Sequence, residues 1–164
     1  MNPVSGYSHS MRTVVFAFVA LIVLHAPNIQ AQSSDNYLTR YIAGLNNAMP
    51  PEGEPAMAAN LFAMNATQVH VLGEPPGGPQ QNREEIRKFF SGFKDMFSDW
   101  THIEHSRMTQ GNRAVWEGLA QGHHRETGKP IKLPVVFFLK FDNGGAVREA
   151  RIYIDARSIG DQLN

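Results

Sequence analysis

The sequence predicts a single α+β domain in which helices precede an antiparallel sheet. Up to Phe97 most apolar residues recur at the spacing of amphipathic helices, and from Trp100 onward they alternate with polar residues. Helices followed by consecutive strands with short turns are typical of an antiparallel sheet that carries its helices on one face.

Residues 1–31 are predicted to be a cleavable secretory signal. Arg12 supplies positive charge, an unbroken apolar run spans residues 13–24, and Pro27 precedes the small residue Ala31. The run of about 12 apolar residues is shorter than the roughly 20 that a bilayer-spanning helix needs. We therefore expect a secreted or periplasmic protein that leaves the membrane after cleavage. An uncleaved membrane anchor is the alternative.

Residues 32–164 are then long enough for one domain with its own core, but not for two. A first amphipathic helix is predicted from an N-cap at Ser33–Ser34 to Ala48, and Pro50 follows its end. A second, short helix has Pro55 near its first turn. The apolar face of the first helix consists of Tyr37, Leu38, Tyr41, Ile42 and Leu45.

Residues 67–72 are predicted to be the first strand, and the Gly- and Pro-rich residues 73–79 an exposed loop. Asn82 is the expected N-cap of a third helix, with Glu84 and Glu85 in the first turn, where the helix dipole favours negative charge. The apolar stripe of this helix is Ile86, Phe89, Phe90, Phe93 and Phe97.

The second half of the domain is predicted to be four strands and a closing helix. Gly111-Asn112 and Asp142-Asn143-Gly144-Gly145 have the composition of tight turns. The expected strands span 100–108, 114–124, 131–141 and a last segment that ends near Asp155, and the helix spans 157–163.

Charge and cysteine content exclude several classes of function. Fifteen basic and fifteen acidic side chains balance, so no electrostatic surface for nucleic acid or anionic lipid is predicted. The chain has no cysteine, so packing alone must stabilise the domain and thiolate zinc sites are excluded. His123 and His124 are adjacent and point to opposite faces of a strand, and we predict no metal and no cofactor.

Three stretches of the second half carry a family resemblance. They are Gly122–Pro130, Val135–Phe138 with Phe141-Asp142 and Gly145, and Arg151–Asp155 followed by Gln162-Leu163. With them, residues 36–163 or so resemble the SnoaL-like branch of the nuclear transport factor 2 and ketosteroid isomerase superfamily. The resemblance implies a cone-shaped, curved, mainly antiparallel sheet wrapped around the N-terminal helices, with an apolar pocket. It also implies a homodimer formed through the open face of the sheet.

Asp155 is the first candidate for a catalytic residue. The resemblance implies that an Asp ending the last long strand, in a Tyr-x-Asp context, faces the pocket as an acid or base. Burial in an apolar cavity raises the pKa of a carboxylate and makes it a useful proton acceptor near neutrality. The alternative is that Asp155 caps the terminal helix or pairs with Arg151 or Arg157.

Two specific templates within the superfamily fit poorly. The resemblance implies an Arg-x-Asp pair for an epoxide hydrolase, but Gly118 and Ala120 occupy the best-matching positions. A steroid isomerase needs acidic residues where the first strand has Asn65 and His70.

His102 and His124 are the candidate assisting groups. His102 shares a strand face with Glu104, and an imidazole backed by a carboxylate is a suitable general base. His124 ends a strand face that carries the small residues Gly118, Ala120 and Gly122, which leave volume for a ligand. We expect His124 at the rim of that cavity, with a solvated surface histidine as the alternative at either position.

Trp116, Phe137 and Tyr153, with Arg151, are the candidate substrate-binding residues, and ordinary core packing is the alternative for the aromatic ones. Val136, Phe138 and Lys140 lie on the opposite strand face from Phe137, where a dimer interface is expected.

The function predicted from these residues is that of an exported, cofactor-free acid/base enzyme of the cyclase, isomerase or dehydratase type. Its substrate is expected to be a small apolar molecule. A secreted binding protein that uses the same pocket without turnover, or a dimeric scaffold, is the alternative.

Overall fold

A computed structural model describes residues 29–70, 78–155 and 157–164. The predicted signal therefore lies outside the described residues up to position 28. Among the described helices, none is long and apolar enough to cross a membrane.

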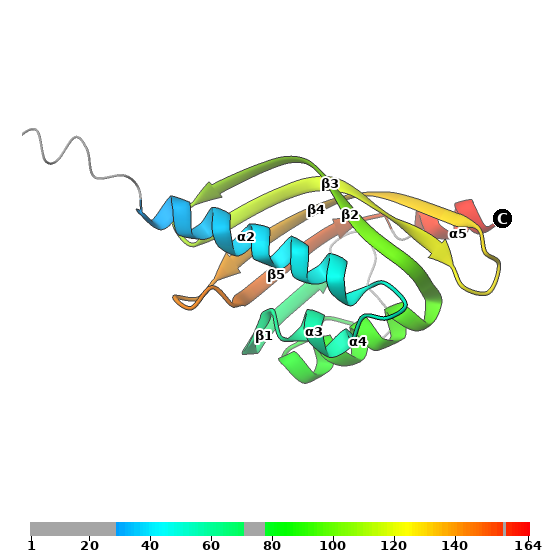
Figure 1. The fold of residues 1–164 in the computed structure, drawn as a ribbon, viewed down its shortest axis with the longest axis horizontal. Coiled ribbons are helices and arrows are strands. Elements are labelled where there is room, and N and C mark those ends of the chain that lie inside the picture. Colours follow the sequence, from blue (N-terminus) through cyan, green and yellow to red (C-terminus); the bar gives the residue numbers. More distant parts are fainter. Residues whose placement is uncertain (1–28, 71–77, 156) are drawn as a thin grey trace, which may run out of the picture.

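The first described helix, α2 (Ile29–Ala48), lies across the concave side of the sheet (Figure 1). It begins before the predicted N-cap, and Ser34 is a buried residue within the helix whose hydroxyl donates to the carbonyl of Gly111. A residue in the helix interior that bonds to the turn at Gly111 is not a helix cap. The predicted apolar face is confirmed: Leu38, Tyr41, Ile42 and Leu45 are all buried.

Helix α3 (Pro55–Ala59) leads into β1 (Phe62–His70), which starts five residues before the predicted strand. The pairing of β1 shifts register between Phe62 and Thr67. That irregularity breaks the period-two pattern on which the strand prediction depended. Phe62 and Ala66 are both fully buried, so this first half of the strand belongs to the core.

Helix α4 (Arg83–Met96) begins as predicted. The side chain of Asn82 accepts a hydrogen bond from the backbone N–H of Glu85 at 3.0 Å. The Glu85 carboxylate in turn accepts from the backbone N–H of Gln81 at 2.7 Å. The first bond satisfies one of the donors that a helix N-terminus leaves unpaired, and the second holds the residue that precedes the N-cap.

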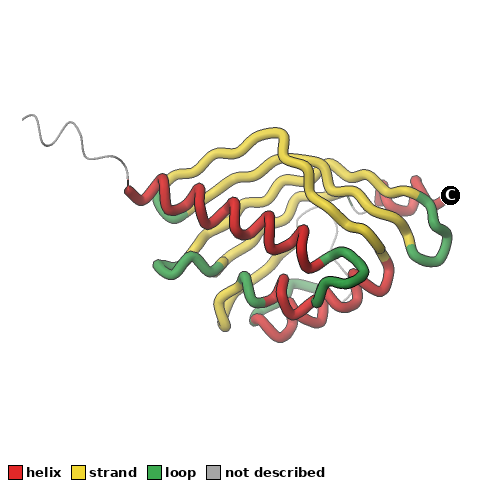
Figure 2. The backbone as a smooth tube through the Cα atoms, in the orientation of Figure 1, coloured by secondary structure: helices red, strands yellow, loops and turns green. Residues whose placement is uncertain are grey.

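Four strands form the predicted antiparallel meander: β2 (Phe97–Gln110), β3 (Arg113–His124), β4 (Pro130–Phe141) and β5 (Val147–Ile154). The sheet order is β1-β5-β4-β3-β2, and β1 pairs with β5 in parallel. Figure 2 shows the sheet curving over the helices. Bulges in β2, one of which contains Asp99 with a φ of 55°, contribute bends to that strand. The core lies between the concave sheet face and α2, α3 and α4.

The closing helix α5 (Arg157–Leu163) is confirmed, and Gln162 ties it to the sheet. Its side-chain amide accepts from the backbone N–H of Lys132 at 2.8 Å and donates to the carbonyl of Lys132 at 3.0 Å. Gln162 thus supplies a pair of strand-like hydrogen bonds to Lys132 near the start of β4. The pairing of β4 with β5 begins only at Val135, three residues further on.

Candidate functional site

An apolar cavity of about 60 Å³ lies beneath the concave face of the sheet. Helices α2 and α4 and all five strands contribute to its wall. Its polar groups come from Tyr41, His70, Trp100 and His102, and no carboxylate, lysine or arginine is among the described lining residues. The described residues that line it are Tyr41, Leu45, Met49, His70, Phe89, Phe90, Phe93, Trp100, His102, Ala120, Val135, Phe137, Ile152 and Ile154.

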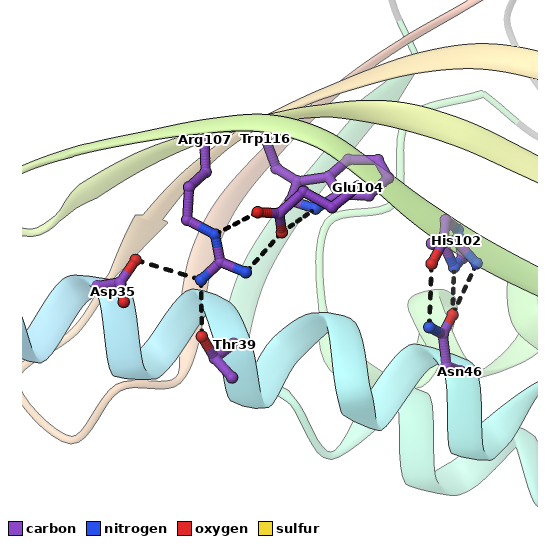
Figure 3. Close-up of polar contacts among 7 residues, drawn as sticks. All are labelled: Asp35, Thr39, Asn46, His102, Glu104, Arg107 and Trp116. Carbon is purple, nitrogen blue, oxygen red and sulfur yellow. Dashed lines mark hydrogen bonds and ion pairs between the residues drawn. The ribbon is translucent and has the colours of Figure 1, made fainter.

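His102, a predicted site residue, lines this cavity and is held by Asn46 of α2 (Figure 3). The Asn46 Oδ1 atom accepts from the backbone N–H of His102 at 2.8 Å, and its Nδ2 donates to the His102 carbonyl at 3.1 Å. The same Oδ1 lies 3.0 Å from Nδ1 of the imidazole. One side chain therefore fixes both the backbone and the ring of His102.

The His102 imidazole is neutral at physiological pH. Burial lowers its pKa from 6.5 to about 4, because the apolar surroundings disfavour the charged form. The rings of Phe137 and Trp116 lie 5.5 and 6.1 Å from it, centroid to centroid. His102 can accept a hydrogen bond or a proton here but does not carry a resident charge.

Tyr41 is a functional candidate that the sequence analysis placed only in the helix core. Its side chain is 2 % exposed, and its hydroxyl has no hydrogen-bond partner among the residues that the structure describes. Burial raises the pKa of this phenol above its ordinary value, so the hydroxyl remains protonated. The available signal was the residue type itself, since a tyrosine on the most buried face of a helix needs a partner for its O–H.

His70 of β1 also lines the cavity. Its Nε2 lies 3.2 Å from Nε2 of Gln68, and its ring is 4.9 Å from that of Phe89. Burial lowers the pKa of His70 to about 4. The site thus contains two neutral histidines on strands β1 and β2.

The predicted pairing of His102 with Glu104 is wrong. Glu104 accepts from Nε1 of Trp116 at 2.8 Å and from Arg107 at 2.6 and 2.5 Å. Arg107 continues to α2, where it donates to Asp35 at 3.2 Å and to Thr39 at 2.7 Å (Figure 3). The Arg107 guanidinium, with the Trp116 N–H, holds the pKa of Glu104 below its ordinary value. The side-chain amide of Asn46, rather than the carboxylate of Glu104, contacts the His102 imidazole.

The small residues of β3 leave less space than predicted. Trp116 is fully buried, and its ring stacks on Phe137 at 5.2 Å. A Cβ on Gly118 would lie 2.3 Å from that indole, and one on Gly122 would lie 2.8 Å from the ring of Trp100. The two tryptophans therefore fill the volume over both glycines. Of the predicted face of β3, Ala120 alone is among the described residues that line the cavity.

Asp155 does not reach the cavity. It is exposed at the end of β5, and its Oδ1 accepts from the backbone N–H of Arg157 at 3.1 Å and lies 3.4 Å from the Arg157 side chain. This is the capping and pairing arrangement named above as the alternative to a pocket position.

Arg151 and Tyr153 lie on the outer face of the sheet. They line an open groove there, together with Phe138, whose ring is 5.3 Å from that of Tyr153. Phe137 pairs with Ile152, and both side chains face the cavity. Because successive residues of a strand point to opposite faces, Arg151 and Tyr153 on either side of Ile152 must face away from it. The expectation that these two residues contact a substrate in the pocket is therefore corrected.

His124 lies at the end of β3, with its Nδ1 3.0 Å from the Thr127 hydroxyl and its ring 6.0 Å from Phe97. It is not among the residues that line the cavity. Within the described part of the chain, no three His, Asp or Glu side chains gather as metal ligands would.

Comparison with known proteins matches residues 38–149 to the SnoaL-like domain. Solved structures with the same fold include a hypothetical protein with a ketosteroid isomerase-like fold from Catenulispora acidiphila, in complex with trimethylamine. It is 19% identical over 77% of this chain and 90% of its own, with a TM-score of 0.65. A putative SnoaL-like polyketide cyclase from Jannaschia is 12% identical over 85% and 96%, with a TM-score of 0.70. A pinacolase from Penicillium brevicompactum is 11% identical over 82% and 96%, with a TM-score of 0.67. No curated protein matches in sequence.

Proposed function

Because this chain belongs to the SnoaL-like domain family, we propose that its cavity binds a small uncharged molecule and that His102 exchanges a proton with it. The observation that carries the proposal is the Tyr41 hydroxyl, which has no partner within the described ranges and lies in the wall of the same cavity as the neutral His102. A buried hydroxyl without a partner costs about 1–3 kcal/mol. A bound carbonyl or hydroxyl oxygen would remove that cost.

The size of the cavity limits what enters it. One water needs roughly 10–15 Å³ of such space, so about 60 Å³ accommodates only a few heavy atoms. The solved structure from Catenulispora acidiphila holds trimethylamine, a molecule of that size, on the same fold. We therefore expect a small ligand, or the small end of a larger one.

The proposed chemistry is a proton transfer that begins and ends with neutral groups. Tyr41 donates a hydrogen bond to an oxygen of the substrate, where negative charge develops. His102 takes a proton from a neighbouring C–H and returns it to another atom of the same molecule. Because burial disfavours the imidazolium, the proton must be returned. Isomerisation satisfies this balance, and so does dehydration, in which the proton leaves with the departing hydroxyl as water.

Deuterium exchange tests this proposal without a known substrate. The purified protein is incubated with acetone in D₂O, and loss of the methyl protons is followed by NMR. We expect faster exchange with the wild type than with buffer, and a loss of most of that acceleration in H102Q and in Y41F. H105Q, at an exposed histidine on the same strand, is the matched control. Acetone binding without accelerated exchange would favour the alternative of a non-catalytic binding protein.

Export and dimerisation are proposed on separate grounds. The sequence of residues 1–31 supports secretion or transfer to the periplasm, and the N-terminal residue of the protein recovered outside the cytoplasm tests it. The outer sheet face supports a homodimer, because Met108 and Phe138 are 70 % and 45 % exposed there.

A further inference from the structure

The orientation of the Asn46 amide determines where His102 carries its proton. Nδ2 of Asn46 must face the His102 carbonyl, and Oδ1 must face the His102 backbone N–H, because the reverse orientation would place donor against donor and acceptor against acceptor. Oδ1 is therefore the atom that contacts the ring. Since this oxygen only accepts, Nδ1 of His102 must carry the hydrogen, and Nε2 retains its lone pair.

A chain of amides determines the tautomer of His70 in the same way. The Gly78 carbonyl accepts from Nε2 of Gln80 at 2.5 Å, so Oε1 of Gln80 faces Gln68 and accepts from its Nε2 at 3.2 Å. The same Gln68 nitrogen donates to Nε2 of His70 at 3.2 Å. His70 therefore also carries its proton on Nδ1.

This amide arrangement leaves Oε1 of Gln68 buried without a partner in the described part of the chain. Rotating the Gln68 amide would bring two acceptor oxygens together at Gln80, so the orientation is retained despite that cost.

We propose that Asn46 is a positioning residue that holds Nε2 of His102 as a permanent hydrogen-bond acceptor, and that the cavity therefore selects ligands that carry a hydroxyl. No partner for this nitrogen is found within the described part of the chain. The opposite edge of the ring is occupied by Asn46, so the edge with Nε2 is the one left for the cavity. The ligand part of the proposal rests on the proposed function, whereas the tautomer of His102 does not.

The remaining cavity wall supports the same selectivity. Its described lining contains no cation to pair with an anion, and its titratable groups are Tyr41, His70 and His102 themselves. An anionic ligand would face the lone pair of Nε2 in apolar surroundings, which is unfavourable. A neutral alcohol can donate to Nε2 and accept from the Tyr41 hydroxyl. A ketone of the same size can accept from Tyr41 only.

The first test is a measurement of the ¹⁵N shifts of the His102 ring in the purified, ligand-free protein at pH 7. These shifts distinguish a protonated from an unprotonated ring nitrogen. We expect Nδ1 to be protonated and Nε2 unprotonated. A protonated Nε2 would overturn the assignment, whatever the protein binds.

The second test compares 2-propanol and acetone, which share a skeleton of four heavy atoms, in NMR titrations. We expect 2-propanol to bind about tenfold more tightly, the difference made by one buried hydrogen bond. In N46D the carboxylate favours the imidazolium, Nε2 becomes a donor, and the preference should reverse. N47D, at the exposed neighbouring position, is the control.

Equal affinity of the wild type for the two probes would overturn the selectivity. If neither probe binds while Nδ1 of His102 is protonated, the proposed function fails and the tautomer assignment is supported. The two failures are thus distinguishable. N46D retains an oxygen acceptor for the His102 backbone, and the wild-type ring shifts decide the tautomer even if this variant does not fold.

Discussion

Glu104 accepts a hydrogen bond from the indole N–H of Trp116 at 2.8 Å, and this contact determines the partners of both residues. Trp116 is fully buried, so its only polar atom needs an acceptor. Arg107 holds the carboxylate in place from the other side. The outcome is a structural network that joins β2, β3 and α2. It replaces the general base that the sequence suggested, a His102 imidazole paired with the Glu104 carboxylate.

Replacing Glu104 by Leu is therefore expected to lower the free energy of unfolding by about 1–3 kcal/mol, because it leaves the Trp116 N–H buried and unpaired. E104Q keeps an acceptor oxygen and should lose less. Urea unfolding of the two variants checks this. Equal losses in E104L and E104Q would contradict the role given to the Trp116 contact.

Gly118 is expected to tolerate no side chain. A Cβ there would lie 2.1 Å from the carbonyl oxygen of Ile103 and 2.3 Å from the Trp116 ring. G118A should lower the free energy of unfolding by about 1–3 kcal/mol, the usual cost of overpacking. G92A is the control, since nothing lies within 4 Å of a Cβ on that exposed helical glycine. There, alanine should stabilise the helix by about 0.5–1 kcal/mol. An unchanged free energy of unfolding in G118A would show that the backbone of β2 at Ile103 can move away at little cost.

Folding stability should depend on pH through the two cavity histidines. Both have a pKa of about 4 in the folded protein and about 6.5 when unfolded, so the unfolded chain binds more protons between these values. The free energy of unfolding should therefore be at its full value above pH 6.5 and fall as the pH drops toward 4. Each histidine should contribute about 3 kcal/mol to this fall.

Urea unfolding at pH 7 and pH 5 measures the effect. H102Q should show a smaller difference between the two pH values than the wild type does, and H105Q should not. The same dependence in H102Q and the wild type would contradict the assignment of a buried, neutral His102.

The elements most completely predicted from sequence are those whose signals are local. The N-cap at Asn82, the apolar stripe of α4 from Ile86 to Phe93 and the turns of the meander each lie within a few residues of the structure they specify. Phe97, predicted as the end of that stripe, begins β2 instead. The start of β1 was missed because a register shift after Phe62 removes the alternation. In β2, which the prediction began three residues late, the positive φ of Asp99 interrupts the pattern in the same way.

The site was less predictable because its contacts are distant in sequence. Asn46 and His102 are 56 positions apart, and an exposed-looking amide late in a helix gives no sign of its partner. Among the candidates from sequence, His102 and Phe137 line the cavity. Residue type alone suggested them. It did not fix strand register, which decides that Tyr153 faces away from them.

Replacement of Asp155 is expected to affect the C-terminal helix and not the cavity. Its carboxylate accepts from the backbone N–H of Arg157 at the start of α5. D155A should increase hydrogen exchange of the α5 amides, and D155N, which keeps an acceptor oxygen, should increase it less. Binding of 2-propanol should be unchanged in both variants. Weaker binding in D155N with an intact helix would restore a role in the site for Asp155.

The outer sheet face is expected to hold two copies of the chain together. Phe138 is 45 % exposed at the centre of the open groove, between Val115 and Tyr153. An aspartate at this position would replace buried aromatic surface by a charge that the dimer must desolvate, so F138D should dissociate it. Light scattering coupled to size exclusion should give the mass of a dimer for the wild type and of a monomer for F138D.

M57D is the control. It introduces the same charge at an apolar residue of α3 that is 47 % exposed, and it should remain dimeric. A wild type that stays monomeric at every concentration tested would contradict the interface, and a dimeric F138D would place it on another surface.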